Sequence, residues 1–427
     1  MTGSWNRIPQ HAPAQTEPLW SRHQPLPATH RPLLAYGNGR SYGDVCQNED
    51  GSLLLTRGMD HFIDFDRRNG VIRCEAGVLL DELLKLIVPH GWFVPVTPGT
   101  RMITLGGAVA NDVHGKNHHV AGSFGEHVLE LGLRRSDGGD LRLSRSSHPE
   151  LLSATLGGLG LTGLITDVTL QLMPIGSPWM EVEARRFRNL DGFFQINAEA
   201  EKRWPYTVAW IDCIGPRRGR GVYFSARHTD APDTERHYRS RQRRMPVDPP
   251  ISLVNGLSLR AFNSLYYHQP RRRLSVSHYE PYFYPLDSLL DWNRIYGRRG
   301  FYQYQCVLPP QAGRASVAML IDRIAESGQG SFLAVLKTFG DRPAPGMLSF
   351  ARPGVTLALD FPNHGERTLA LFASLDSIVA EAGGALYPGK DARMPASMFR
   401  RGFPRWQAFS RHIDPAFSSS FWRRVNP

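Results

Sequence analysis

The sequence lacks a hydrophobic run that could cross a membrane and a cysteine pair that could hold a metal. No stretch approaches the roughly eighteen consecutive apolar residues of a membrane span, and the first ten residues, MTGSWNRIPQ, show neither the basic nor the apolar region of a signal peptide. The four cysteines form no CxxC pair and indicate neither a zinc knuckle nor a disulfide framework. We therefore expect a soluble or peripheral protein at the inner membrane, cytoplasmic for lack of a signal peptide, with the periplasmic face left open.

Lysine is also scarce. Among 427 residues, 50 are basic and 39 acidic, which gives a net charge of +11, but the lysines are only Lys85, Lys116, Lys202, Lys337 and Lys390. A codon bias accounts for most of the arginine excess, and it makes each remaining lysine informative. The positive charge admits nucleic acid, an anionic membrane surface or a phosphorylated ligand as partner, and composition alone does not choose among them.

Composition and patterning predict a globular α and β protein. The chain is 41% hydrophobic and 21% charged, and its length predicts two domains or one unusually large one. Residues 1–31 are rich in proline and histidine, which favours a flexible N-terminal segment. Strands are predicted at 33–36, 52–56, 71–75 and 164–172, a hairpin at 129–134 with 141–144, and a helix at 79–88 that Gly91 ends.

Two glycine-rich segments are poorly suited to a packed core. The first, Gly37 to Asp44, follows a strand, and its backbone N–H groups can cradle an anion such as pyrophosphate. It departs from the GxGxxG fingerprint because its third glycine stands one position late, at Gly43, so a plain tight turn stays open. The second runs from Pro98 to Gly125, PGTRMITLGGAVANDVHGKNHHVAGSFG. Its small residues and hydroxyls allow a backbone to lie against a flat, phosphate-bearing ligand.

Together, Gly37–Asp44, Thr104–Gly107 and His114–Gly125 resemble the FAD-binding domain of the vanillyl-alcohol oxidase and p-cresol methylhydroxylase (PCMH) superfamily. Within it, the chain is similar to the decaprenylphosphoryl-β-D-ribose oxidase group, the flavoprotein half of an epimerase. The resemblance extends from about Leu33 to the C-terminus, through the motifs DWNR at 291–294, QYQ at 303–305, DFP at 360–362 and Tyr387 with KD at 390–391. The string HGKNHH followed by AGSFG is a specific part of it.

The resemblance implies an α+β fold with a two-subdomain PCMH-type FAD-binding domain at 32–176. An α+β substrate-binding domain with an antiparallel sheet would be inserted at 177–384, with a basic, partly mobile region at 215–275. Residues 385–427 would return to the FAD domain as a C-terminal segment.

The resemblance also implies which residues bind FAD. The first glycine loop would hold the pyrophosphate, and the second segment the ribityl chain and the edge of the isoalloxazine. The implied cofactor-binding residues are Gly37, Asn38, Gly39, Arg40, Ser41, Tyr42, Gly43, Gly99, Thr100, Thr104, Leu105, Gly106, Gly107, Asn111, Asp112, Val113, His114, Gly115, Gly122, Ser123, Ile165, Tyr387 and Lys390. Asp44 follows Gly43 where covalently flavinylated relatives often carry a histidine, so we expect non-covalent FAD.

The scarce lysines gain meaning here, since Lys116, Lys337 and Lys390 lie in these family motifs. Unlike a guanidinium, an ammonium can titrate, and beside a flavin it stabilises the negative charge that develops on reduction. We assign Lys390 to the flavin–substrate interface and Lys337 to sugar or phosphate contacts, the alternative being ordinary surface lysines. The expected substrate-binding residues are Tyr296, Gln303, Gln305, Lys337, Thr356 and Ala358.

Four histidines cluster in or just after the second segment, His114, His118, His119 and His127. Imidazole is the commonest metal ligand, but no cysteine or tight carboxylate set accompanies them, so we expect no metal site. We expect His114 to contact flavin or substrate and the other three to be structural or hydrogen-bonding.

The resemblance implies hydride transfer from C2 of a phosphoribosyl unit to the flavin, giving a 2-keto sugar on the way to an arabinose donor. Lys390, His114 and Tyr42 are the candidate catalytic residues that would take up the hydroxyl proton, and the sequence does not rank them. A short-chain NADH-dependent reductase is the implied partner. Relatives commonly carry asparagine and cysteine where this chain has Thr356 and Ala358, which leaves the sugar and the lipid open.

Two other functions remain: an FAD-dependent alditol or aldonolactone oxidase of the same superfamily, and a basic nucleic-acid-binding protein. The second has only the charge in its favour, because no reading helix or aromatic RNA-binding motif is present. The arginines of 217–244, nine against three acidic residues, and Arg271 to Arg273 flank the apolar segment 251–267. That pattern favours peripheral contact with an anionic membrane bearing a lipid-linked phosphate, and no nucleic acid.

Overall fold

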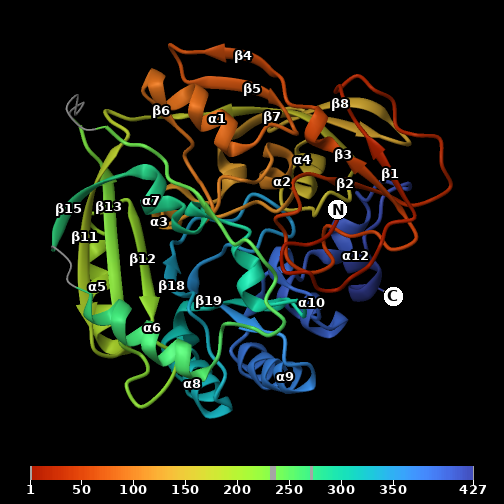
Figure 1. The fold of residues 1–427 in the computed structure, drawn as a ribbon. Coiled ribbons are helices and arrows are strands. Elements are labelled where there is room, and N and C mark those ends of the chain that lie inside the picture. The colour runs from red at the N-terminus through yellow and green to blue at the C-terminus, as the bar shows by residue number, and fades with distance from the viewer. Residues whose placement is uncertain (1, 231–236, 270–272, 427) are drawn as a thin grey trace.

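The computed structural model describes residues 2–230, 237–269 and 273–426, which form helices and strands around three main sheets (Figure 1). A three-stranded and a five-stranded sheet come from the first 171 residues, and an eight-stranded sheet comes from residues 179–386. Within the described ranges, no helix combines the length and the apolar character needed to span a membrane. Residues 231–236, Arg271 and Arg272 of the predicted basic region lie outside the described residues.

The strands, in chain order, are β1 (Gln15–Pro18), β2 (Leu33–Tyr36), β3 (Ser52–Leu55), β4 (Phe62–Asp66), β5 (Val71–Glu75), β6 (Trp92–Phe93), β7 (Val128–Arg135), β8 (Gly139–Ser144), β9 (Leu164–Gln171), β10 (Met173–Pro174), β11 (Trp179–Phe187), β12 (Tyr206–Ile211), β13 (Gly221–His228), β14 (Arg243–Arg244), β15 (Leu274–His278), β16 (Leu289–Leu290), β17 (Phe301–Leu308), β18 (Ala334–Phe339), β19 (Gly354–Pro362) and β20 (Ala385–Leu386).

The α-helices are α1 (Leu80–Ile87), α2 (Leu105–Ala110), α3 (His118–Ala121), α4 (Pro149–Thr155), α5 (Leu190–Ala200), α6 (Gly256–His268), α7 (Tyr279–Phe283), α8 (Pro310–Ser327), α9 (Glu366–Glu381), α10 (Ala396–Gly402), α11 (Trp406–Ser410) and α12 (Ser420–Val425). Short 3₁₀ turns cover Thr56–Gly58, Val88–His90, Phe124–His127, Pro285–Ser288, Trp292–Tyr296 and Pro388–Lys390.

Local patterning accounts for the elements near the N-terminus. The four strands, the hairpin and the helix predicted between residues 33 and 172 are all confirmed as β2, β3, β5, β9, β7 with β8, and α1. Helix α1 buries Leu80, Leu83 and Leu84 on one face. The turn after it ends at Gly91, whose φ of 78° lies in the left-handed region that glycine adopts at little cost.

The sheets differ in strand direction. The three-stranded sheet β1-β3-β2 is parallel. The five-stranded sheet β4-β5-β9-β7-β8 and the eight-stranded sheet β15-β11-β13-β12-β18-β19-β17-β20 are antiparallel throughout. The expected mixture of helices and strands with an antiparallel sheet is therefore confirmed.

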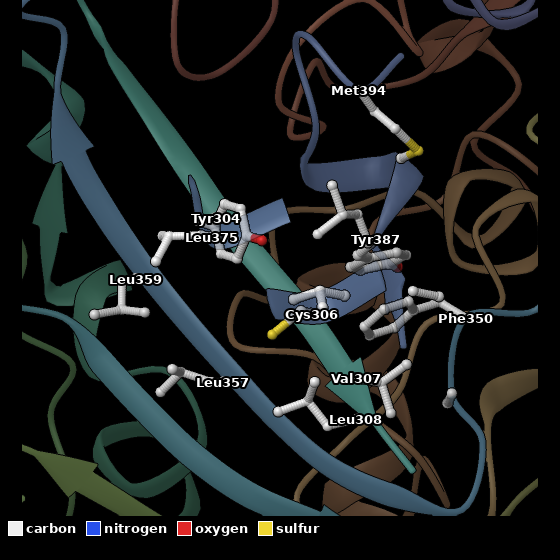
Figure 2. Close-up of a cluster of buried hydrophobic side chains, with 14 of the residues drawn as sticks. Tyr304, Cys306, Val307, Leu308, Phe350, Leu357, Leu359, Leu375, Tyr387 and Met394 are labelled. Carbon is white, nitrogen blue, oxygen red and sulfur yellow. The ribbon is translucent and has the colours of Figure 1, made fainter. Parts of the chain in front are cut away.

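The eight-stranded sheet has a helical face and an open face. Helices α5, α8 and α9 pack on the first (Figure 1). On β19 the residues alternate, so that Leu357 and Leu359 join the core with those helices while Thr356 and Asp360 point the other way. Figure 2 shows Leu357 and Leu359 beside the residues of β17, with Tyr387 lying against Phe350 at a ring separation of 4.5 Å.

Both ends of the chain pack against the first glycine loop. Asn6 is fully buried: its side chain accepts a hydrogen bond from the Gly43 N–H (2.9 Å) and donates one to the Phe301 carbonyl (3.0 Å). Near the other end, Arg424 of α12 bridges Asp44 and Asp391. Residues 3–9 thus have fixed partners where composition alone favoured flexibility, because long-range hydrogen bonds decide their position.

Candidate active site

A cavity of about 1190 Å³ lies between the two glycine segments and the open face of the eight-stranded sheet. Further parts of its wall come from residues 281–292 and from Trp5. Pockets for one drug-sized ligand measure about 300–1,000 Å³. The cavity therefore has room for a large cofactor together with a substrate.

Most of the predicted cofactor-binding residues line this cavity. Those on its wall are Gly37, Asn38, Gly39, Arg40, Ser41, Tyr42, Gly99, Thr100, Thr104, Gly106, Gly107, Asn111, Val113, His114, Gly115, Ile165, Tyr387 and Lys390. The structure places Gly43, Leu105, Asp112, Gly122 and Ser123 behind the wall instead.

The first glycine loop presents its backbone to the cavity. Gly39 and Gly43 have φ values of 58° and 68°, and a Cβ at Gly43 would stand 1.8 Å from the Asp391 carbonyl oxygen. Within the described part of the chain, the N–H groups of residues 38–41 donate to no protein acceptor. The Arg40 guanidinium lies 4.1 Å from the Trp5 ring centroid and forms no ion pair with a described carboxylate. These unpaired donors and one cation suit a diphosphate.

The second segment is held by its own hydrogen bonds. Its buried Asp112 carboxylate accepts from the hydroxyls of Ser123 (2.8 Å) and Ser349 (2.5 Å) and from the Gly125 N–H (2.8 Å). These bonds turn Asp112 and Ser123 away from the cavity. At the start of α2, the N–H groups of Leu105 and Gly106 donate to carbonyls of neighbouring turns. The segment therefore offers the cavity a smooth surface of small residues, a fit for the flat ring system of a flavin.

Within this segment, His114 is held by two side chains of the sheet. Its Nδ1 lies 2.8 Å from Lys337 Nζ on β18, and its Nε2 lies 3.0 Å from Gln305 Nε2 on β17. Lys337 Nζ also donates to the Gly115 carbonyl (2.8 Å). Burial lowers the pKa of Lys337 to about 7, and burial together with the Lys337 charge holds the His114 pKa well below its ordinary value.

The two protonation states of this pair have different donors. A charged Lys337 donates to His114 Nδ1, which puts the ring proton on Nε2. A neutral Lys337 can accept from Nδ1–H, which leaves Nε2 to accept from Gln305. With Gln305 Nε2 as the donor, both ring nitrogens of His114 are engaged when Lys337 is neutral, and a further proton on His114 would then break the bond from Gln305.

A second polar cluster surrounds Lys390. Its Nζ lies 3.8 Å from the Tyr42 ring centroid, which favours the ammonium by a cation–π contact. Burial lowers the pKa of Lys390, and the nearby Asp360 carboxylate opposes that shift. Burial likewise raises the pKa of Asp360. Asp360 accepts a hydrogen bond of 2.5 Å from Gln303, its direct cross-strand partner.

Five of the six expected substrate-binding residues line the cavity on the sheet side: Gln303, Gln305, Lys337, Thr356 and Ala358. Lys337 and Thr356 are cross-strand partners, as are Gln305 and Ala358. Tyr296 is the exception, because its ring stacks on Phe301 at 4.2 Å, behind the wall.

The other family lysine and histidines have separate partners. Lys116 donates to the Tyr282 carbonyl, and burial lowers its pKa to about 7. His118 Nδ1 accepts from the Gly340 N–H (3.1 Å). The His119 and His127 rings bond to the carbonyls of Trp204 (3.0 Å) and Ala121 (2.8 Å).

Sequence reasoning missed several residues of the wall, among them Asp360 and Trp5. Asp360 belongs to a recognised motif, but nothing in the strand pattern indicates that its carboxylate faces a cavity rather than the helices. Trp5 lies in the proline-rich segment, and only its contacts with Arg40 and Trp292 show its place.

Comparison with known proteins agrees with this geometry. Residues 13–144 match the family described as FAD binding domain. The chain is 35% identical to decaprenylphosphoryl-β-D-ribose oxidase of Mycolicibacterium smegmatis over 92% of this chain and 89% of that protein. It is 33% identical to an uncharacterized protein of Streptomyces coelicolor over 82% of this chain and 100% of that one. A rice mitochondrial L-galactono-1,4-lactone dehydrogenase is 26% identical over 50% of this chain and 38% of its own length.

The long match spans both the glycine segments and the strands that face them, and the residues present suit the cofactor that such proteins use. The chain belongs to the decaprenylphosphoryl-β-D-ribose oxidase family of FAD-dependent oxidoreductases.

Proposed function

We propose that this chain oxidises the 2-hydroxyl of a polyprenylphosphoryl-β-D-ribose to the 2-keto sugar, the first half of an epimerisation to the arabinose donor. The observation that supports it best is one cavity shared by an anion-binding glycine loop and a buried cluster of Lys390, Lys337, His114 and Asp360. The Mycolicibacterium smegmatis relative, named for oxidation of such a ribose, aligns with both.

Bound FAD supplies the acceptor for the hydride that leaves the alcohol carbon. The backbone N–H groups of residues 38–41 and the Arg40 guanidinium would hold its diphosphate. Gly106 and Gly107 leave space for the flat ring. The chain's own task is to orient the alcohol and to take up the hydroxyl proton as the hydride leaves.

Lys390 is the proton acceptor that the contacts favour. Burial lowers its pKa, which makes the neutral amine accessible, and its side chain lines the cavity. Both ring nitrogens of His114 already have side-chain partners, Lys337 and Gln305, so we assign His114 to positioning rather than to proton uptake. Burial and the Asp360 charge hold the Tyr42 pKa well above its ordinary value, which keeps the phenol protonated.

Flavin bleaching under anaerobic conditions tests the proposed substrate. Polyprenylphosphoryl ribose should reduce the flavin, whereas free alditols and L-galactono-1,4-lactone should not. The reverse pattern would favour the alditol or aldonolactone oxidase alternative, for which the rice relative over half of the chain is the supporting observation. A chain that carries no flavin and shifts nucleic acid in a gel would contradict both.

We also propose peripheral contact with an anionic membrane through α6. Leu257 and Leu265, about two turns apart on this helix, are 81% and 74% exposed, and Ile251 before it is 75% exposed. Arg243, Arg260 and Arg273 are exposed in the same part of the chain. An apolar helix face with basic neighbours is typical of interfacial helices.

Vesicle sedimentation tests this contact. Vesicles with phosphatidylglycerol should sediment the protein, and added salt or a Leu257→Ser/Leu265→Ser variant should weaken that binding. Met319→Ser on α8 is the matched control, since Met319 is also exposed but belongs to another helix. Vesicle binding that changes neither with salt nor in the double variant would contradict the proposed membrane contact.

Two further proposals concern the cofactor and a partner. We propose that FAD is non-covalent, since Asp44 is buried against Arg424 behind the loop; acid precipitation should leave the flavin in the supernatant. We propose a short-chain NADH-dependent reductase as partner. Adding one with NADH should turn the keto product into the arabinosyl lipid.

A further inference from the structure

One carboxylate oxygen in the cavity has no partner in the described structure. Asp360 is 1% exposed, its Oδ1 accepts from Gln303 Nε2, and its Oδ2 is buried and forms no hydrogen bond. Asp360 lines the cavity together with Gln303 and Lys390. A buried acceptor without a donor costs about 1–3 kcal/mol, so such a group persists where a ligand supplies the donor.

The surroundings limit what that donor can be. The charged and titratable groups that face Asp360 are Lys390 from the C-terminal segment, Tyr42 from the first loop and Tyr296 from the turn before β17. Among the ion pairs of the described residues none joins Lys390 to Asp360, and the Lys390 ammonium lies over the Tyr42 ring. Oδ2 itself is enclosed, so a ligand donor that reaches it must be small, and a hydroxyl group fits that description.

The strand register fixes the direction of this acceptor. Gln303 and Asp360 are opposite each other on β17 and β19, and the Asp360 N–H donates to the Ser331 hydroxyl (3.0 Å). Both the backbone and one carboxylate oxygen are thus held by other strands or loops. A preorganised acceptor of this kind discriminates strongly between a ligand that carries the hydroxyl and one that lacks it.

We propose that Asp360 is a substrate-contacting specificity residue, whose Oδ2 accepts a hydrogen bond from a sugar hydroxyl that is not oxidised. This inference rests on the proposed function for the identity of the sugar. A ribofuranosyl phosphate whose 2-hydroxyl reacts has its 3- and 5-hydroxyls left to fill this role.

The test uses the FAD-loaded enzyme and an Asp360→Asn variant. Asparagine keeps an oxygen for Gln303 but places an amide donor where Oδ2 accepts. We expect unchanged flavin content and unchanged reduction by dithionite, with kcat/KM for polyprenylphosphoryl ribose lowered about 10- to 100-fold, mostly through KM. Asp191→Asn, which removes an exposed carboxylate of α5, is the matched control and should change neither value.

Deoxy analogues make the test specific. The wild type should lose about 10- to 100-fold in kcat/KM with either the 3-deoxy or the 5-deoxy lipid, and Asp360→Asn should lose less than about 3-fold with that same analogue. Equal losses in both enzymes would overturn the proposal. If Asp360→Asn does not retain FAD, wild-type insensitivity to both analogues would overturn it as well.

Failure of the proposed function is distinguishable from failure of this inference. A wild type that no ribosyl lipid reduces contradicts the function alone. The same comparison then uses the alditol or lactone that does reduce the flavin, with its own deoxy analogues. Sensitivity of the wild type, but not of Asp360→Asn, to one missing hydroxyl would still support the role of Asp360.

Discussion

The two ends of the cavity are built by different means. The end at the first glycine loop consists of backbone: unpaired N–H groups at residues 38–41 and glycines whose missing Cβ atoms permit close approach. The end at the eight-stranded sheet consists of side chains from β17, β18 and β19 and from two loops, namely Gln303, Gln305, Lys337, Asp360, His114 and Lys390.

This difference separates binding from selection. A backbone cradle recognises any diphosphate and depends little on side-chain identity, so it serves a cofactor common to many oxidoreductases. A cluster of buried titratable side chains depends on each member's charge and register. Substrate choice is expected to vary there.

The largest effect is expected from a variant that disrupts the backbone end of the cavity. Gly43→Ala places a Cβ 1.8 Å from the Asp391 carbonyl oxygen at a φ of 68°, which should cost about 3 kcal/mol or more and abolish FAD retention. Flavin absorption per protein and the midpoint of urea unfolding measure both. Gly138→Ala is the control, since a Cβ there meets nothing within 4 Å. A Gly43→Ala variant with full flavin content would contradict the inference that the backbone of the first glycine loop binds the cofactor.

The next effect is at the side-chain end. Lys390→Met should keep FAD but reduce it about 10²- to 10⁴-fold more slowly with substrate, because the proton acceptor is lost. Stopped-flow measurement of flavin bleaching gives the rate, with dithionite reduction as the control for cofactor integrity. A normal bleaching rate would remove Lys390 from the mechanism.

A smaller effect concerns stability against pH. Burial lowers the pKa of Lys116 and Lys337 to about 7, whereas lysine in an unfolded chain titrates near about 10.4. Between these values the unfolded chain binds more protons, so stability should rise as pH goes from 7 to about 9. Thermal unfolding at both pH values measures the rise.

Lys337→Met should make this rise smaller, since one of the contributing lysines is gone. Lys202→Met, which alters an exposed lysine, should leave it unchanged. A melting temperature that does not depend on pH in the wild type would contradict the low pKa values at the side-chain end.

The smallest effect is an added thiol. Ala358→Cys should change stability by less than about 0.5 kcal/mol, because the side chain points into the cavity. The new thiol should react with an electrophile small enough to enter. Mass mapping should place the label on residue 358 and leave the buried Cys74, Cys213 and Cys306 unmodified. Absence of label at 358 would show that this wall is closed.

Much of the fold near the N-terminus could be predicted because it depends on local patterns. The alternation at 164–172 and the apolar face of 80–87 gave elements that the structure confirms. The position of Tyr296 behind the wall could not be predicted, since its ring stacks on Phe301, the first residue of β17. Asn6 and Trp5 escaped prediction for the same reason, as their partners lie up to about 300 positions away.

By itself, the sequence determined the cofactor class and the family, because glycine spacing and the HGKNHH string are local properties of the chain. The tertiary structure alone decided which polar side chains share a cavity. Cross-strand register sets Gln303 against Asp360, and the packing of the second glycine segment against β18 brings His114 to Lys337. Burial then shifts the pKa values of Asp360, Lys337 and His114. Those shifts come from desolvation and neighbouring charges, which exist only once distant strands have packed together.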